Sequence, residues 1–181
     1  MSDVLKADSL RQLLDYDPAT GSLFWRRRDI SLFAGDLRAC RSWNARWAGK
    51  EAFTSKNNHG YKVGSIFGKI STAHRIIWII AHGENAESQI DHINGDRADN
   101  RLCNLRKANN SENHKNQRLP STNKSGAIGV HMDKRWGTWR AEIFDKGTRF
   151  YLGSFKTIDA AISARQEAEA KLKYHPNHGK R

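Results

Sequence analysis

The first half of the chain alternates short apolar and polar runs that predict both helices and strands. Residues 8–15 have the spacing of a helix, and residues 22–27 alternate as a strand does. Residues 61–73 predict a hairpin that turns at a glycine. The apolar run 74–83 predicts a buried helix ending at a glycine, with a buried strand as the alternative because isoleucine is β-branched. Residues 28–60 have weak periodicity, so the pattern assigns no element to them.

The second half begins with two strand-like segments, 90–96 and 100–105, followed by a helix-compatible segment, 106–118. Proline, serine, asparagine and glycine then gather in 119–126, a composition typical of a linker. Three further strand-like runs follow, separated by turns, and an alanine-rich helix is predicted over 158–174. The pattern therefore predicts an α+β protein built from small modules.

The distribution of charge indicates a polyanionic partner. The 181 residues include 31 Lys and Arg against 19 Asp and Glu, which gives a net charge of +12. Basic residues outnumber acidic ones by 13 to 8 in 1–85, by 6 to 5 in 86–118 and by 12 to 6 in 119–181. A nearly neutral middle between two basic flanks is expected of a chemical centre between segments that hold nucleic acid. A basic solvated surface is the alternative.

The cysteines and the apolar runs indicate which cellular compartment and which class of partner are expected. Cys40 and Cys103 form no CxxC pair, so the sequence supports neither a disulfide framework nor a cysteine-ligated zinc site. The first residues lack the apolar core of a signal peptide, and the longest apolar run, 76–81, is too short to span a bilayer. A cytoplasmic protein that binds nucleic acid is therefore expected, with no membrane partner.

Aspartate, histidine and asparagine side chains cluster from residue 91 to residue 114 in a pattern suited to phosphodiester hydrolysis. Asp91 offers a carboxylate oxygen and Asn113 an amide oxygen, and both suit Mg²⁺ or Mn²⁺. Neighbouring residues of a strand point to opposite faces, so Asp91 can face a metal while His92 faces the attacking water, provided that the strand bends. Histidine is neutral often enough near pH 7 to act as a general base. A polar surface turn is the alternative interpretation.

The run DHINGDRADNRLCNLRKANNSEN, residues 91–113, resembles the HNH motif of homing and phage endonucleases, whose core is the ββα-metal fold. The resemblance implies one divalent metal, Mg²⁺ before Mn²⁺, held by Asp91 and Asn113. It makes His92 the general base and Asn104 the residue that braces the loop between the two strands. The last motif position is Asn, as in the Asn-bearing subset of the family, and the adjacent His114 is an alternative ligand.

Segments upstream of the motif are similar to those of phage-encoded HNH proteins. They are LLDYDPATGSLFWRRR, WNARWAGKEAF and GYKVGSIFGKISTAHRIIW. Such proteins carry an HR pair where this chain has His74 and Arg75. The resemblance makes Arg75 a candidate phosphate contact, with burial against the helix as the alternative, and Trp78 is expected in the core.

The segment GVHMDKRWGTWRAEIFDKGTRFYLGSFKTIDAAISARQEA resembles the plant ethylene-response-factor DNA-binding domain, the AP-two/ERF type, which also occurs beside HNH domains in homing endonucleases. The resemblance implies a three-stranded antiparallel sheet, packed on one helix, that enters the major groove of DNA. Alternate positions of a strand share a face, so Arg140 and Glu142 are expected to project together, as are Arg149 and Tyr151. Arginine can then read guanine through two hydrogen bonds.

Two departures from the plant pattern leave the register and the base preference open. One extra residue lies between Val130 and Trp136, and Phe144 stands where the plant family has an arginine. Trp139 is expected in the core of the sheet, whereas Trp136 is expected to contact DNA. The full set of candidate DNA contacts is Arg75, Lys115, Arg118, Lys124, His131, Lys134, Arg135, Trp136, Arg140, Glu142, Arg149 and Tyr151.

The predicted organisation has five parts. They are a DNA-contacting α+β region packed on the nuclease core (1–85), the HNH motif (86–118), a basic flexible linker (119–126), the AP-two/ERF-type domain (127–176) and a tail (177–181). The resemblance predicts a site-preferring, homing-type endonuclease of phage or mobile-element origin, monomeric on double-stranded DNA. It is expected to nick, because one HNH centre cuts one strand per engagement. A non-catalytic DNA-binding regulator with a decayed centre, and an RNA- or ribosome-associated basic protein, are the alternatives.

Overall fold

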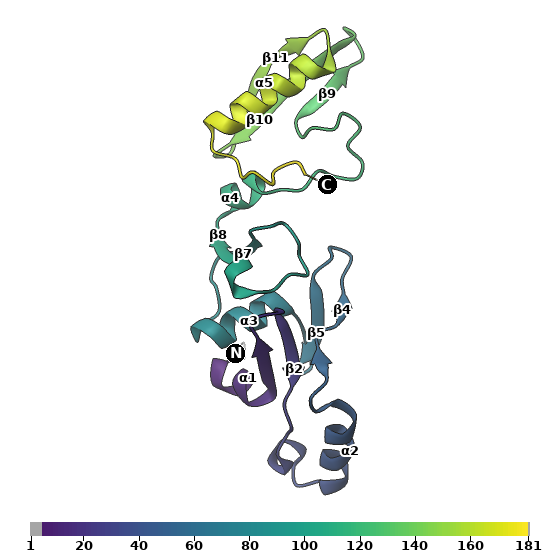
Figure 1. The fold of residues 1–181 in the computed structure, drawn as a ribbon, viewed down its shortest axis with the longest axis vertical. Coiled ribbons are helices and arrows are strands. Elements are labelled where there is room, and N and C mark those ends of the chain that lie inside the picture. The colour runs from purple at the N-terminus through teal and green to yellow at the C-terminus, as the bar shows by residue number, and fades with distance from the viewer. Residues whose placement is uncertain (1–4, 181) are drawn as a thin grey trace. The chain divides into compact units, whose positions relative to one another are not determined.

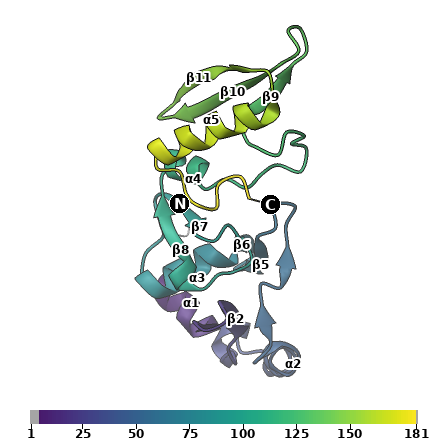
Figure 2. The ribbon, with the colours of Figure 1, turned by 45° about the horizontal axis from the view of Figure 1, so that its top comes forward.

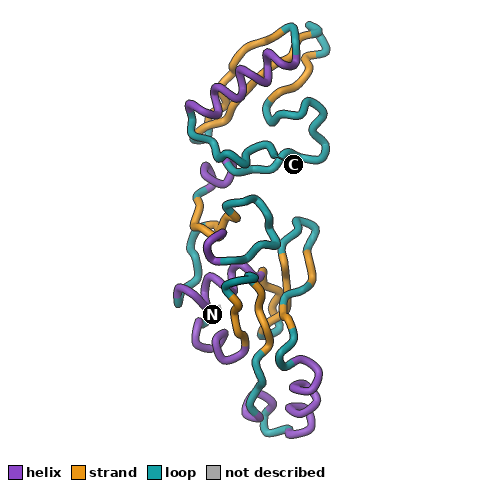
Figure 3. Tube along the Cα trace, viewed as in Figure 1, coloured by secondary structure: helices purple, strands orange, loops and turns teal. Residues whose placement is uncertain are grey.

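The computed structural model describes residues 5–180, which form two compact units that divide between Lys107 and Ala108 (Figure 1). Residues 1–4, at the start of the segment that lacks a signal-peptide pattern, and Arg181, the last residue of the predicted tail, lie outside the described residues. Helices and small antiparallel sheets alternate along both units, so the predicted α+β class is confirmed (Figure 3). Within residues 5–180, every helix is too short or too polar to cross a bilayer.

The first unit contains three small antiparallel sheets, ordered β1-β2-β3, β4-β5-β6 and β7-β8. Its elements are α1 (Ala7–Leu13), β1 (Leu14–Asp17), β2 (Ser22–Trp25), the 3-10 helix η1 (Ile30–Phe33), α2 (Leu37–Trp47), β3 (Glu51–Ala52), β4 (Ser55–Lys56), β5 (Lys62–Ile66), β6 (Lys69–Thr72), α3 (Ala73–His82), β7 (Gln89–His92), the 3-10 helix η2 (Leu102–Asn104) and β8 (Leu105–Ala108).

The helix predicted over 74–83 is confirmed as α3, and it forms the centre of the core of this unit. Ile76 and Ile77 are fully buried, and Trp78 is buried as expected. The helix ends at Gly83, whose φ of 82° is the left-handed conformation that glycine tolerates. Figure 1 shows α3 beside α1 and the first strands, so its apolar residues are covered on several sides.

The sequence pattern did not predict α2, which lies in the segment of weak periodicity. Its buried positions are Cys40 and Asn44 rather than aliphatic side chains, so no apolar repeat marks the helix. The carboxylate of Asp36 caps its start by accepting a hydrogen bond from the backbone N–H of Ala39, at 2.9 Å. The side chain of Asn44 accepts from the backbone N–H of Arg28 and donates to its carbonyl, at 2.8 and 2.9 Å. Hydrogen bonds of the Asn44 side chain to the backbone of Arg28 therefore hold α2 in place.

The hairpin predicted over 61–73 is confirmed as β5 and β6. Phe67 and Gly68 join the strands with φ angles of 51° and 71°, the positive values that two-residue hairpin loops favour.

The second strand of the HNH segment was predicted over 100–105, and this position is wrong. The structure has η2 up to Asn104 and the strand β8 only from Leu105 onward. Side-chain hydrogen bonds of Asn104 hold the preceding residues in a loop, so pairing with β7 starts later.

The helix compatible with 106–118 is reduced to α4, Asn110–Lys115. Its start is fixed by a capping box, in which Asn109 accepts from the N–H of Glu112 and the Glu112 carboxylate accepts from the N–H of Asn109. Residues before the cap belong to β8.

The second unit contains α4 and a three-stranded antiparallel sheet, ordered β11-β10-β9, which α5 covers on one face (Figure 2). The strands are β9 (Val130–Asp133), β10 (Thr138–Asp145) and β11 (Thr148–Phe155), and the helix is α5 (Ile158–Lys171). Thr157 caps α5, because its side chain accepts a hydrogen bond from the backbone N–H of Ala160 at 3.3 Å. Ala141 and Ala161 are fully buried between sheet and helix, and Trp139 packs against them as expected.

The C-terminal segment pairs with the chain that precedes the predicted linker. The backbone N–H groups of His175 and Gly179 donate to the carbonyls of Lys115 and Gln117, at 3.0 and 2.9 Å. The N–H of Leu119 donates to the carbonyl of Lys180. These bonds make 115–119 and the C-terminal segment parts of one unit.

Candidate active site

Strand β7 carries two adjacent polar residues, Asp91 and His92, into the interior of the first unit. Asp91 is 8% exposed and His92 is 2% exposed. Burial of a carboxylate and an imidazole is costly unless both are hydrogen-bonded, so their partners define the site.

One partner of His92 is Asn100, whose Oδ1 lies 3.0 Å from Nε2 of the imidazole. Nδ2 of Asn100 donates to the carbonyl of Ala98, which leaves Oδ1 as the atom that faces His92. Because an amide oxygen only accepts, Nε2 carries the proton in the neutral imidazole and Nδ1 is its basic nitrogen. Burial lowers the pKa of His92, so the neutral form is favoured at pH 7.

Two further aromatic side chains pack against His92. The ring of His74 lies edge-on at 5.2 Å between centroids, and the ring of Tyr61 lies at 5.8 Å. Burial lowers the pKa of His74 to about 3, so this imidazole is neutral. These rings exclude water from one side of His92 and help to fix its orientation.

One partner of Asp91 is Arg106 of the neighbouring strand β8. Nη2 and Nε of Arg106 lie 2.9 and 3.1 Å from Oδ2 of Asp91. The sequence analysis missed Arg106, Asn100 and Tyr61, because each meets its partner only through strand pairing or loop geometry.

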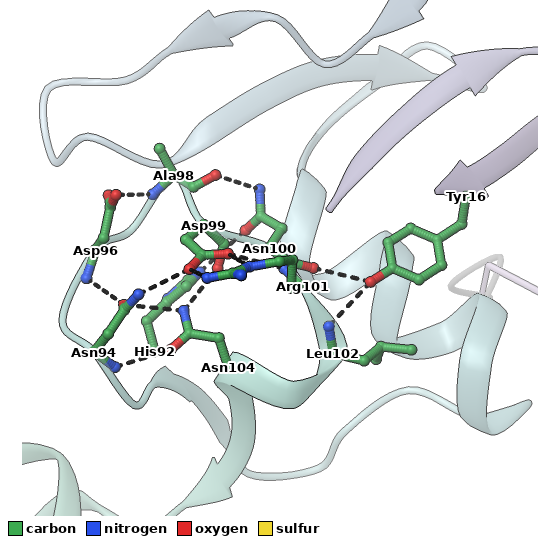
Figure 4. A network of polar contacts seen from close by, with 10 residues as sticks. All are labelled: Tyr16, His92, Asn94, Asp96, Ala98, Asp99, Asn100, Arg101, Leu102 and Asn104. Atoms are coloured by element: carbon green, nitrogen blue, oxygen red, sulfur yellow. Dashed lines mark hydrogen bonds and ion pairs between the residues drawn. The ribbon is translucent and has the colours of Figure 1, made fainter. Parts of the chain in front are cut away.

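The loop between β7 and η2 is held by a network of side-chain hydrogen bonds (Figure 4). Oδ1 of Asn104 accepts from the backbone N–H of Asn94 at 2.9 Å, and its Nδ2 donates to Oδ1 of Asn94 and to the carbonyl of Asp99. The carboxylate of Asp99 pairs with Arg101 at 2.6 Å, which lowers its pKa to about 2. Asn104 thus makes the contacts of a side chain that braces this loop.

The N-terminal hairpin supports the same loop from the other side. The hydroxyl of Tyr16 accepts from the backbone N–H of Leu102 at 3.0 Å and donates to the carbonyl of Asn100 at 3.4 Å (Figure 4). Gly21, with a φ of 73°, approaches so closely that a Cβ there would lie 2.5 Å from the backbone nitrogen of Arg101. The fold of β1 and β2 therefore positions the residue that holds His92.

Asn113 lies on α4 in the second unit. Its neighbour His114 is exposed, with its ring 6.2 Å from that of Phe144.

The donor set can be tested against the chemistry of the expected metal. Within residues 5–180 there is no group of three or more His, Cys, Asp or Glu side chains able to hold a metal. A cation at Asp91 would therefore need amide, phosphate or water oxygens as its remaining ligands. That donor set fits Mg²⁺, which keeps several waters and binds few protein carboxylates.

The sheet of the second unit presents the predicted polar face away from α5. Arg140 and Glu142 lie side by side with 3.6 Å between Nη2 and Oε1, and Arg149 reaches Oε2 of Glu142 at 3.4 Å. Tyr151 stands opposite Glu142 and lies under the guanidinium of Arg140. The predicted sharing of one face is confirmed, and His131 joins it opposite Arg140.

The remaining candidate DNA contacts differ in their surroundings. Lys115 pairs with Asp145 at 2.8 Å and donates to the carbonyl of Leu172, so its ammonium is engaged inside the second unit. Arg75 donates to the side chain of Asn85 and, more weakly, to the carbonyl of Ala86. The other remaining candidates are all exposed, namely Arg118, Lys124, Lys134, Arg135 and Trp136.

Comparisons with known proteins place the segment that contains Asp91 and His92 in a known family. Residues 71–115 match the HNH endonuclease family. The chain is 34% identical to Protein 3.8 of Escherichia phage T7 over 82 residues, which cover 45% of this chain and 68% of that protein. No solved structure matches the chain. The chain therefore belongs to the family of phage T7 Protein 3.8 and carries an HNH endonuclease domain over residues 71–115.

Proposed function

We propose that the chain is a metal-dependent endonuclease that hydrolyses phosphodiester bonds of double-stranded DNA. The observation that carries the proposal is the buried pair of Asp91 and His92, with Nε2 of His92 engaged by Asn100. An imidazole held in this way keeps Nδ1 as its base, and its lowered pKa keeps it neutral at pH 7.

In the proposed reaction, Nδ1 of His92 takes a proton from a water molecule while the water oxygen bonds to phosphorus. The bond from phosphorus to the 3′ oxygen breaks, and the leaving oxygen takes a proton from solvent. A bound divalent cation would neutralise charge on the phosphate and on the leaving oxygen. Asp91 and Asn113 are the proposed ligands of that cation, which their oxygen donors suit to Mg²⁺ or Mn²⁺, and Asn104 is the proposed brace.

We assign sequence preference to the sheet of the second unit, which resembles the AP-two/ERF type. Arg140 and Arg149 are the proposed readers of base edges, while exposed basic residues contact phosphate. One HNH centre per monomer is expected to nick one strand per engagement. The similarity to a phage protein supports a phage origin. A homing-type enzyme that acts in the cytoplasm of a bacterial host is the form of this function that we propose.

Cleavage of a supercoiled plasmid with Mg²⁺ tests the catalytic assignment. His92→Ala is expected to cut about 100-fold more slowly, because a positioned general base contributes at least that factor. His59→Ala, which changes an exposed turn residue, serves as the matched control and is expected to cut normally. Equal cutting by His92→Ala would overturn the assignment.

Mapping of the cut sites on each end-labelled strand tests nicking and site preference. The wild-type chain is expected to cut one strand at few positions. The double variant Arg140→Ala, Arg149→Ala is expected to cut at many positions. DNA binding without cleavage under any divalent cation would instead establish a non-catalytic DNA-binding regulator.

A further inference from the structure

A cavity of about 640 Å³ opens in the first unit, between α2, β3 and β5. This volume lies within the range of roughly 300–1,000 Å³ that is typical of ligand pockets. Three tryptophans line the cavity, Trp25, Trp43 and Trp47, together with the guanidinium of Arg28. Flat aromatic walls beside a cation are suited to a ligand that has both a ring and an anionic group.

Arg28 lacks a compensating anion in the cavity. Its guanidinium carbon lies 3.7 Å from the ring centroid of Trp43 and 5.2 Å from that of Trp25. Among residues 5–180 no carboxylate forms a salt bridge with Arg28, and its buried Nε has no hydrogen-bond partner. Burial lowers its pKa, which reflects the cost of this uncompensated charge.

The acidic residue at the cavity does not offset Arg28. Oε1 of Glu51 lies 2.9 Å from Nζ of Lys62 and accepts a hydrogen bond from Ser22 at 2.9 Å. A buried polar atom without a partner costs free energy, so the cavity is suited to a ligand that brings an acceptor to Arg28.

The charge around the cavity favours a polyanion. Residues 26–50 contain seven Lys and Arg against two aspartates, Asp29 and Asp36. Both aspartates cap helical turns through hydrogen bonds to backbone N–H groups. The excess in this short segment equals the whole net charge of residues 1–85, so the basic character of that region is concentrated here.

Exposed apolar side chains stand among the residues that line the cavity. Leu32 is 50% exposed, Trp47 is 39% exposed and Phe67 is 56% exposed. Clustered exposed apolar groups beside a pocket are typical of a binding site rather than of a plain solvated surface.

We propose that this cavity binds one unpaired nucleotide of a DNA strand, with the base stacked on the tryptophans and a phosphate on Arg28. The inference rests on the proposed endonuclease function and names a substrate class for it, namely DNA that carries an unpaired or extruded base. A paired base is stacked between its neighbours, so only a base outside the helix presents its face to aromatic side chains.

Strand β5 links the cavity to His92. Tyr61, which precedes β5, packs against His92, and Val63 to Ile66 line the cavity. In Figures 1 and 2, α2 lies at the end of this unit away from β7. A nucleotide in the cavity would therefore fix the position of its strand along the part of the unit that leads through β5 to His92.

Binding measured without metal tests the proposal separately from cleavage. The full-length chain in EDTA is titrated with a fully paired duplex and with the same duplex carrying one unpaired 2-aminopurine. About tenfold tighter binding of the second duplex is expected, with quenched 2-aminopurine fluorescence, because a base stacked on an aromatic side chain contributes roughly 5- to 150-fold in affinity.

Two cavity variants and two matched controls decide the outcome. Arg28→Gln and Trp47→Ala are expected to reduce the preference to less than about threefold and to relieve the quenching. Arg38→Gln and Arg41→Gln remove the same charge from exposed positions of α2 and are expected to weaken both duplexes equally. Trp47 is partly exposed, so Trp47→Ala keeps the test valid if Arg28→Gln fails to fold.

Each failure identifies the inference that is wrong. Equal affinity of the wild-type chain for both duplexes, or a preference that survives both cavity variants, would overturn the nucleotide pocket. An intact preference in a chain that cuts DNA under no condition would overturn the endonuclease function and leave the pocket in place.

Discussion

Nε2 of His92 and Oδ1 of Asn100 lie 3.0 Å apart, and both side chains are almost wholly buried. This single contact selects the tautomer of the imidazole and leaves Nδ1 as its basic nitrogen. Asn100 sits in a loop whose shape depends on Asn104 and Tyr16. The orientation of the proposed base is therefore set by residues from two distant parts of the chain.

Replacing Asn100 is expected to lower the cleavage rate while the chain still binds DNA. Asn100→Ala removes the acceptor that fixes the tautomer, so a loss of about 100-fold is expected. Asn100→Asp keeps an acceptor and is expected to retain more of the rate. Nitrogen NMR of the imidazole reports the tautomer directly, and Asn58→Ala, at an exposed turn, is the control. A wild-type rate for Asn100→Ala, with the tautomer unchanged, would contradict this role.

Arg106→Gln is expected to lower stability in metal-free buffer and to lower the metal requirement for cleavage. The buried carboxylate of Asp91 loses its ion pair, which costs about 1–2 kcal/mol because Arg106 is itself partly exposed. A cation near Asp91 would then no longer be repelled, and half-maximal cleavage is expected at about tenfold less Mg²⁺. Thermal melting and Mg²⁺ titration measure both effects. Arg106→Lys keeps the charge and is the control. A higher Mg²⁺ concentration for half-maximal cleavage in Arg106→Gln, but not in Arg106→Lys, would contradict this prediction.

Gly21→Ala is expected to damage the site more than the same change at another left-handed glycine. A Cβ at Gly21 would lie 2.6 Å from the carbonyl carbon of Asn100, whereas at Gly35, with a φ of 84°, it would meet nothing within 4 Å. Both substitutions strain the backbone by about 1 kcal/mol, and the clash adds about 2 kcal/mol at Gly21 alone. Chemical unfolding and cleavage rates measure the difference. Equal effects of the two substitutions would show that the hairpin does not support the loop.

His74 is expected to make the first unit less stable as the pH falls. Its pKa is about 3 in the folded chain against 6.5 when unfolded, so the unfolded chain takes up the proton first. Stability contributed by this group is complete above pH 6.5 and falls by about 1.4 kcal/mol per pH unit below it, until the pH reaches the folded pKa. Urea unfolding on either side of pH 6.5 checks the slope. His74→Gln is expected to reduce the slope of the unfolding free energy against pH, and His59→Gln is expected to leave that slope unchanged. An equal slope in the wild type and both variants would argue against burial of a neutral His74.

The sequence by itself determined the elements whose signals are local. The apolar run of α3, the glycine turn between β5 and β6, and the strands and capped helix of the second unit follow from periodicity and turn chemistry within a few residues. The adjacent residues Asp91 and His92 are likewise recognisable as a motif, because metal-assisted phosphodiester hydrolysis needs an oxygen ligand and a general base close together.

Tertiary structure alone decided the features that depend on distant partners. Helix α2 is attached through Asn44 to the backbone of Arg28, a polar contact that no apolar repeat announces. The loop held by Tyr16 and Asn104 delays β8, and it also brings Asn100 to His92. Hydrogen bonds and close backbone approaches between segments far apart in sequence fix these positions. The pattern of hydrophobic and polar residues cannot predict such contacts, because it reflects only local periodicity.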